Sequence, residues 1–292
     1  MRTRMAAKED LAKVLEEDWV DPQRRPYVTG LVAYLPVKDG FPCDFEIAER
    51  RQYKGRGFFI LGDVAVIHGR KPSPQEVERI IQFRHPRGVL WIQSLHGHTR
   101  MPESEVVYGE VGEVRHVEDN FTYLFDPKKV MFAQGNLEEK RRLAALIRKS
   151  GIPERVADMY AGIGYFTIPM AGSGASVHAM EINPVAFRYL KRNIVENGLS
   201  DRVQATCGDC RDLLFGTYDR ILMGHFDAIT MFPNALEHVH RGTVIHIHSL
   251  GSVECEINFQ LARTGFSADI HVHKVKKYRP HTWHVVHDVM LL

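Results

Sequence analysis

The segment Asp158-Met-Tyr-Ala-Gly-Ile-Gly164 decides the fold of the second half of the chain, because it joins a short apolar run to a helix-forming stretch. Gly162 and Gly164 have no Cβ, so the backbone can turn sharply there and approach a ligand closely. Residues 156–160, at the start of the segment, are predicted to form a buried strand. In doubly wound α/β sheets, ligands bind beyond the carboxyl ends of the strands, where this glycine turn would lie.

Predicted strands and helices alternate on both sides of this turn. Asn136, with Glu139 three residues later, opens a helix before the turn, and Asn183 with Pro184 opens another after it. Further strands are expected at residues 175–180, 202–206, 220–223, 243–248, 269–275 and 282–290. Strands separated by helices predict a mostly parallel sheet that is covered on both faces.

The preceding part of the chain has a different pattern. Between residues 53 and 126 the apolar runs are short and alternating, which is typical of antiparallel strands and hairpins, with a turn expected at Asp119-Asn120. One helix interrupts them, opened by Ser73 and Glu76 as a capping box. We therefore predict a smaller α+β domain in this part of the chain.

Length and composition set the wider limits. The chain has 292 residues, a net charge of +2, 44% hydrophobic and 25% charged residues, which is typical of a soluble globular protein. We place the domain boundary between residues 130 and 131, giving domains 1–130 and 131–292. No apolar run approaches the ~18 residues that a membrane span requires. The charged residues 1–10 contain no apolar signal region, so we expect a cytoplasmic protein.

Two acidic residues follow the next two predicted strands. Glu181 stands about where an acidic group accepts from ribose hydroxyls, and a carboxylate at Asp209 can accept from an adenine amine. Either acid can instead have a local structural role, such as Glu181 ahead of a helix. A dinucleotide fingerprint needs a third glycine, but position 167 is Thr, which disfavours a nicotinamide cofactor. The pattern predicts an adenosine-containing cofactor without a pyrophosphate.

The sixteen histidines invite a metal-site interpretation. His96 and His98, and likewise His246 and His248, are spaced by two, which places each pair on one face of a strand. A zinc site needs three or four ligands with supporting spacing, and the sequence shows no such set. We predict no metal.

The segments around these motifs resemble class I S-adenosylmethionine (SAM)-dependent transferases. More narrowly, they resemble the family of tRNA position-37 enzymes that includes the guanine N1-methyltransferase and the wybutosine-pathway aminocarboxypropyltransferase. The resemblance implies a Rossmann-like, mostly parallel seven-stranded sheet with a smaller N-terminal α+β domain. Met223-Gly224-His225 is similar to the Met-Gly-Tyr of the aminocarboxypropyl branch, whereas the methyltransferase branch typically has Asn-x-Pro there.

The resemblance also implies which residues bind SAM. Glu181 would bind the ribose, Asp209 and Cys210 would surround the adenine, Lys140 would meet the methionine carboxylate, and Ala133 would lie nearby. Related sequences usually have Ser-Pro-Ala where this chain has Ala133-Gln134-Gly135, and Arg at the position of Lys140. Lysine keeps the charge but loses the bidentate fork of arginine.

Three residues of the glycine segment complete the predicted SAM site: Asp158, Gly162 and Gly164. The implied reaction transfers the 3-amino-3-carboxypropyl group of SAM to C7 of 4-demethylwyosine in tRNA(Phe). That carbon must lose a proton, and His225 is the candidate base by its place and its near-neutral titration. The alternatives are a tRNA guanine-37 N1-methyltransferase and a SAM- or tRNA-binding protein without this activity.

The implied partner is the anticodon loop of tRNA(Phe), whose bases can be splayed out for recognition. Two groups of basic residues are candidates for contacts with its backbone. They are Arg84, Arg87 and Arg100 in the first domain, and Lys274, Lys276, Lys277 and Arg279 near the end of the chain.

Overall fold

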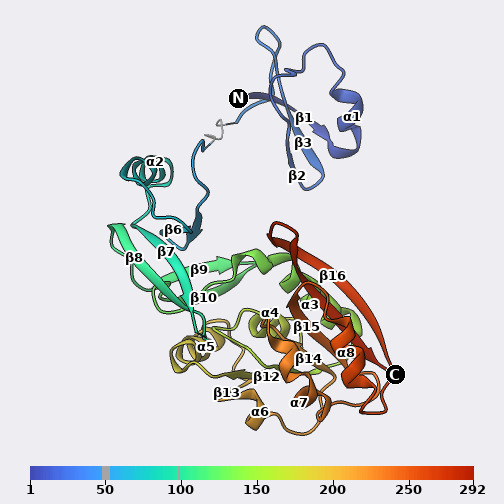
Figure 1. The fold of residues 1–292 in the computed structure, drawn as a ribbon. Helices are drawn as coiled ribbons and strands as arrows, with labels where there is room; N and C mark the ends of the chain where they lie inside the picture. The colour runs from blue at the N-terminus through green and yellow to red at the C-terminus, as the bar shows by residue number, and fades with distance from the viewer. Residues whose placement is uncertain (48–52, 98) are drawn as a thin grey trace. The chain divides into compact units, whose positions relative to one another are not determined.

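The computed structural model describes residues 1–47, 53–97 and 99–292, and it divides into two compact units, Met1–Gly55 and Arg56–Leu292 (Figure 1). The boundary predicted between residues 130 and 131 lies inside the second unit and stays a prediction. The first unit contains an antiparallel sheet in the order β2-β3-β1-β4. Its elements are β1 (Arg2–Ala7), η1 (Lys8–Asp10), α1 (Leu11–Val14), β2 (Tyr27–Thr29), β3 (Val32–Pro36) and β4 (Phe45–Glu46).

A small apolar core holds the first unit together. Ala33 and Leu35 alternate with more exposed residues along β3, so both side chains point to the same face of the sheet. They are buried with Val20, and Leu11 and Trp19 pack against this cluster.

The second unit begins with a four-stranded sheet in the order β5-β6-β7-β8. Its elements are β5 (Phe59–Leu61), β6 (Val64–His68), α2 (Pro74–Arg84), β7 (Gly88–His96) and β8 (Met101–Gly109). Helix α2 connects the parallel pair β6 and β7. The capping box predicted at its start is confirmed, because Ser73 accepts from the Glu76 backbone N–H and Glu76 accepts from that of Ser73.

A separate hairpin of β9 (Val114–Glu118) and β10 (Phe121–Phe125) follows. Its turn residues Asp119 and Asn120 have φ values of 49° and 68°, which is the left-handed conformation that two-residue hairpin turns require. Asn193, in the helix that spans residues 184–196, holds the hairpin in place. Its Oδ1 accepts from Leu124 N at 2.7 Å, and its Nδ2 donates to the carbonyl of Ile163 at 3.0 Å. Asn193 therefore connects the hairpin directly to the glycine segment.

The remainder of the chain forms a seven-stranded sheet in the order β13-β12-β11-β14-β15-β17-β16. Strands β11 to β15 run parallel to one another, and β17 is antiparallel to both of its neighbours, β15 and β16, so the predicted mostly parallel sheet is confirmed. The strands are β11 (Arg155–Asp158), β12 (Ser176–Glu181), β13 (Val203–Cys207), β14 (Arg220–Met223), β15 (Val244–Leu250), β16 (Ala268–Arg279) and β17 (Thr282–Leu291). The helices are η2 (Gln134–Asn136), α3 (Leu137–Ser150), α4 (Thr167–Gly172), α5 (Pro184–Glu196), α6 (Cys210–Leu213), η3 (Ala228–Met231), α7 (Phe232–Leu236) and α8 (Glu254–Leu261).

Both faces of this sheet are covered. Val156 and Ala157 are neighbours on β11, yet they belong to different apolar clusters, because successive strand residues point to opposite faces. Leu143 of α3 and Leu190 of α5 lie in the first cluster, and Phe232 of α7 lies in the second. Figure 1 shows the helices on the two sides of the strands.

The expected cap of α3 differs from the structure. Asn136 occupies the N-cap position, but its side chain makes no capping hydrogen bond. Glu139 pairs with Arg142 instead of returning to the Asn136 backbone, with 2.8 Å between Arg142 Nε and Glu139 Oε2. The bidentate ion pair with Arg142 therefore holds the Glu139 side chain away from the start of the helix.

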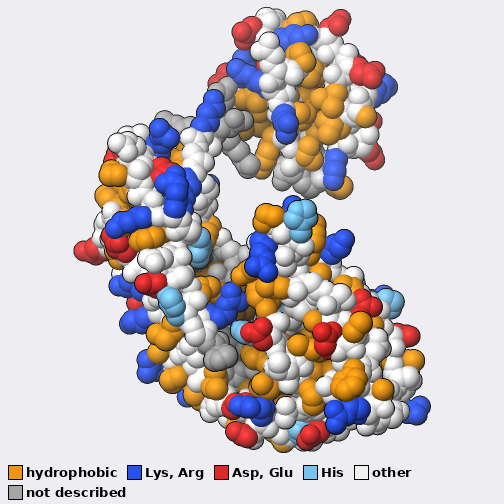
Figure 2. Space-filling model, viewed as in Figure 1, with side chains coloured by type: hydrophobic (Ala, Val, Ile, Leu, Met, Phe, Trp, Pro, Cys, Tyr) orange, Lys and Arg blue, Asp and Glu red, His pale blue; other side chains and the backbone are white. Residues whose placement is uncertain are grey.

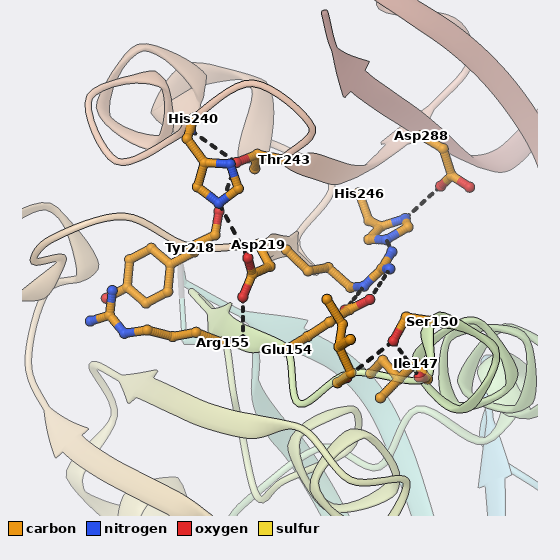
Figure 3. A network of polar contacts seen from close by, with 12 residues as sticks. Ile147, Ser150, Glu154, Arg155, Tyr218, Asp219, His240, Thr243, His246 and Asp288 are labelled. Atoms are coloured by element: carbon orange, nitrogen blue, oxygen red, sulfur yellow. Dashed lines mark hydrogen bonds and ion pairs between the residues drawn. The ribbon is translucent and has the colours of Figure 1, made fainter.

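A buried polar network ties this sheet together (Figure 3). Arg220 forms a bidentate pair with Glu154, and its Nη1 lies 2.6 Å from Nε2 of His246. Because arginine only donates, this nitrogen of His246 accepts and the other, Nδ1, carries the proton and donates to Asp288 at 2.5 Å. Burial alone would raise the pKa of Asp288, but its hydrogen bonds with His246 and Arg142 hold that pKa below the usual range. Both ring nitrogens of His246 are thus occupied within the protein.

Candidate active site

A cavity of about 940 Å³ opens at the carboxyl ends of β11, β12, β13 and β14. Residues that follow these strands form one wall, including Gly162, Glu181, Asp209 and His225. The rest of the wall comes from the linker before α3, from strands β5, β6 and β7 of the second unit, and from β16. The cavity lies where the sequence analysis predicted ligand binding.

The glycine turn owes its shape to two left-handed backbone positions. Gly162 has φ 59° and Gly164 has φ 101°, and a Cβ on Gly162 would lie 2.5 Å from the Tyr165 ring. Gly162 lines the cavity, whereas Gly164 packs against Ile168 and Leu190 behind it. Thr167, at the position of the missing third glycine, is buried and donates its hydroxyl to Asp158 at 2.7 Å.

Glu181 holds the turn from the next strand. Its Oε2 accepts from the Gly162 backbone N–H at 2.7 Å, and its Oε1 accepts from that of Asn183 at 2.6 Å. Burial raises the pKa of Glu181, and these two hydrogen bonds oppose the rise. The carboxylate therefore lines the cavity in a fixed orientation, with lone pairs that can also accept from ligand hydroxyls.

Asp209 and Cys210 lie together on the cavity wall at the start of α6. Hydrogen bonds from Arg211, whose side chain is 2.6 Å away, lower the pKa of Asp209. Burial raises the pKa of the Cys210 thiol to about 11, so this cysteine is a neutral, packed wall residue. The Asp209 carboxylate can accept a hydrogen bond from the amine of a flat base that packs against the uncharged Cys210 side chain.

Asp158 is buried behind the cavity and does not line it. Burial raises its pKa to about 6, above the value of about 3.9 expected in the unfolded chain. Above pH 6 the buried charge therefore destabilises the fold, and stability increases as the pH falls from 6 towards 4.

We expect Asp158→Asn to be more stable than the wild type at pH 8 by about 1–3 kcal/mol in the absence of ligand. The neutral amide imitates the protonated carboxyl and can still accept from Thr167. Urea unfolding at pH 8, 6 and 4 measures the difference, which should shrink towards pH 4. A variant that is less stable than the wild type at pH 8 would contradict this account.

Lys140 does not line the cavity, although the resemblance implied a role in binding the methionine carboxylate. Its side chain is 3% exposed and forms an ion pair with Glu118 of β9. Its Nζ also lies 5.0 Å from the centre of the Phe132 ring. Burial lowers the pKa of Lys140, while Glu118 opposes that change. Ala133, in contrast, lines the cavity as expected from its place in the linker.

His225 lines the cavity immediately after β14. Its ring stacks on Tyr160 with 5.5 Å between centroids, and its Nδ1 accepts from the Asp227 backbone N–H at 3.2 Å. The structure thus brings together Ala133, Gly162, Glu181, Asp209, Cys210 and His225 at one cavity. Lys140, Asp158 and Gly164 lie outside its lining.

Several lining residues were not predicted as cofactor-site residues. Phe166 and Phe226 form apolar walls, and Arg100 and Lys276 contribute positive charge. Both cations were predicted from the sequence to contact RNA. Strand alternation predicts which residues share a face of β16, but it does not say which face meets the cavity.

The histidines and acidic residues do not gather into a metal site in the part of the chain that the structure describes. Within residues 1–47, 53–97 and 99–292, no group of three or more His, Cys, Asp or Glu residues is placed to hold a metal ion. His98 lies outside the described residues, and its partner His96 pairs with Glu103 at 2.7 Å. Among the helices that the structure describes, none has the length and apolar character needed to cross a bilayer.

Comparisons with known proteins identify the family. The model of the TRM5/TYW2 methyltransferase domain matches residues 114–276. A tRNA(Phe) (4-demethylwyosine(37)-C(7)) aminocarboxypropyltransferase of Methanocaldococcus jannaschii is 33% identical over 78% of this chain and 95% of its own length. The protein of that name from Pyrococcus horikoshii is 36% identical over 67% of this chain and 73% of its own length.

A solved structure agrees with these relatives. The crystal structure of M. jannaschii TYW2 in complex with AdoMet superposes with a TM-score of 0.64 at 28% identity, covering 80% of this chain and 99% of that one. The predicted class I SAM-dependent fold and the resemblance on which it rested are both confirmed. The chain belongs to the TRM5/TYW2 methyltransferase-domain family.

Proposed function

We propose that this chain transfers the 3-amino-3-carboxypropyl group of SAM to C7 of 4-demethylwyosine at position 37 of tRNA(Phe). The observation that carries this function is the similarity to two aminocarboxypropyltransferases along most of their lengths. The cavity supports it, because a carboxylate fixed beside a glycine turn suits the ribose of an adenosine cofactor. The tRNA substrate also leads us to infer a cytoplasmic location.

SAM supplies a sulfonium that activates three carbons, so the protein selects the product by positioning. In our proposal Glu181 binds the ribose, and Asp209 with Cys210 surrounds the adenine. Gly162 and Ala133 present backbone to the sulfur-bound chain. Asp158 and Gly164 act indirectly, by holding the turn in shape.

Proton removal completes the reaction. The acceptor carbon forms a bond to the transferred carbon, the carbon–sulfur bond breaks with its electron pair passing to sulfur, and the acceptor carbon then releases its proton. We assign His225 as the acceptor of that proton, because it lines the cavity directly after β14. The proton would go to Nδ1, which would give up its hydrogen bond from the Asp227 backbone N–H.

The runner-up function is N1-methylation of guanine 37, the alternative that the resemblance implied. Two tRNA(Phe) substrates, one with 4-demethylwyosine and one with guanine at position 37, are incubated separately with SAM and the protein, and mass spectrometry of the base tests the two functions. A mass gain equal to one aminocarboxypropyl group supports our proposal. A gain equal to one methyl group on a guanine-37 substrate, without the larger gain, refutes it.

We also propose that the β16–β17 hairpin contacts the tRNA backbone near the anticodon loop. Figure 2 shows lysine and arginine side chains around the tip of this hairpin. Lys277 is exposed, and Lys274 lies over the ring of Trp283, with 5.5 Å from Nζ to the centroid. Arg87 is a weaker candidate, because it pairs with Asp63 at 2.8 Å.

We expect charge reversal at Lys274 and Lys277 to weaken tRNA binding and to lower the slope of log affinity against log salt by about 1 per lost phosphate contact. The matched control is Lys149→Glu, an exposed lysine in the last turn of α3. Filter binding at several salt concentrations measures both. Equal slopes for the double variant and the wild type would refute this interface.

A further inference from the structure

We propose that Lys276, with Asn136 beside it, binds the amino-acid end of SAM in this chain and so takes the role that the sequence assigned to Lys140. This inference rests on the proposed function and names the residues that select the transferred group. Four observations support it, and each concerns residues of the second unit.

The first observation is the unbalanced charge of Lys276. Its half-buried side chain lines the cavity, and within the described chain no acidic residue forms an ion pair with it. Burial lowers the pKa of Lys276, and the nearby cations Arg100 and Lys140 lower it further. A carboxylate that enters this end of the cavity would therefore meet a lysine charge that has no ion-pair partner among the described residues.

The second observation is the space that Gly135 provides. A Cβ on Gly135 would overlap with Lys276 Nζ and lie 2.9 Å from its Cδ. The ammonium thus occupies the position that a larger residue would fill. Gly135 also lines the cavity, so its missing side chain gives Lys276 access to the linker segment where the methionine end is expected.

The third observation concerns Lys140, which already has a carboxylate partner. Its ion pair with Glu118 is buried, with the two side chains 3% and 11% exposed. To bind a ligand carboxylate, Lys140 would have to leave Glu118 as an uncompensated buried charge, which is costly. Lys276 carries no such penalty.

The fourth observation is an unsatisfied oxygen next to Lys276 in the cavity lining. Asn136 lines the cavity, and its Oδ1 is buried without a hydrogen-bond partner in the described chain. A buried acceptor without a donor is unfavourable, and the ammonium of an amino acid is a donor that can satisfy it. Because this oxygen is covered, a rotation of the Asn136 side chain would bring it to the ammonium, while Lys276 would bind the carboxylate.

The test compares ligands that carry or lack this end. SAM carries the amino-acid arm and a sulfonium charge, and methylthioadenosine is a neutral thioether without the arm. S-adenosylhomocysteine, a neutral thioether that keeps the arm, is titrated beside them in the calorimeter, so that the arm's contribution is separated from that of the charge. We expect Lys276→Ala to lower SAM affinity roughly ten- to a hundredfold and to leave methylthioadenosine affinity unchanged. Gly135→Ala should act in the same direction by displacing the ammonium. Lys149→Ala, an exposed lysine of α3, is the control.

Two results would overturn the inference. One is an equal loss of affinity for SAM and methylthioadenosine in Lys276→Ala and Gly135→Ala, and the other is a SAM-selective loss in Lys140→Ala with none in Lys276→Ala. A wild-type protein that binds neither ligand would instead refute the proposed function itself, so the two failures are distinguishable. Thermal melts of each variant verify that it is folded.

Discussion

Glu181→Gln is expected to lower the affinity for SAM more than about a hundredfold, because two charge-assisted hydrogen bonds of about 1.5–3 kcal/mol each are affected. The carboxylate accepts from the backbone N–H of Gly162 at 2.7 Å and from that of Asn183 at 2.6 Å. A glutamine amide would turn one donor towards another donor. The glycine turn would lose its anchor, and the ribose would lose an anionic acceptor.

Calorimetric titration measures this effect, and methylthioadenosine gives a second comparison. Because that ligand keeps the ribose, its affinity should fall with that of SAM, unlike in Lys276→Ala. Glu138→Gln provides a control, since Glu138 pairs with Arg141 on the surface with an 82% exposed side chain. Near-normal binding of both ligands by Glu181→Gln would remove Glu181 from the site.

Arg220→Met is expected to destabilise the protein by about 3–5 kcal/mol, because it leaves a buried carboxylate without its partner. Arg220 and Glu154 are 8% and 7% exposed and lie 2.7 Å apart from Nε to Oε2. The substitution also removes the donor that faces Nε2 of His246, whose other ring nitrogen donates to Asp288 (Figure 3).

Urea unfolding provides the measurement, with Arg192→Met as the matched control. Arg192 also forms a bidentate pair, with Glu113, but both side chains are more than 40% exposed, so its loss should cost about 0–1 kcal/mol. Replacing both members, as in Arg220→Met with Glu154→Leu, should restore part of the stability. If Arg220→Met costs no more than the control, the network does not stabilise the sheet.

Local patterns in the sequence predicted much of this fold. The two glycines set the turn after β11, the Ser73 capping box set the start of α2, and the Asp119-Asn120 turn set the β9–β10 hairpin. Each of these depends on residues within a few positions of one another. That is why they could be predicted without knowledge of the tertiary structure.

The tertiary contacts could not be predicted in this way. Lys140 stands on α3 where a ligand contact was expected, but Glu118 of the hairpin reaches it from 22 residues away in sequence. Asn136 has a good capping side chain, but Glu139 pairs with Arg142 instead. The docking of the hairpin on α5 by Asn193 likewise depends on elements that only the fold brings together.

Among the cavity residues too, some were predicted from a local pattern and others depend on tertiary contacts. Strand ends predicted Glu181, Asp209 and His225 at one edge, because the carboxyl ends of parallel strands meet there. Lys276 lies on β16, which is close to the end of the chain, pairs antiparallel with β17 and reaches the cavity lining. Its position depends on the hairpin of β16 and β17, so its charge alone suggested an RNA contact.

The most direct test of the central claim uses SAM labelled at two places, in the methyl group or in the carboxyl group of the amino-acid arm. Each is incubated with the protein and tRNA(Phe) that contains 4-demethylwyosine, and the label in the tRNA is counted. Our account predicts that the carboxyl label enters the tRNA while the methyl label leaves as methylthioadenosine. Methyl label in the tRNA without carboxyl label would contradict it.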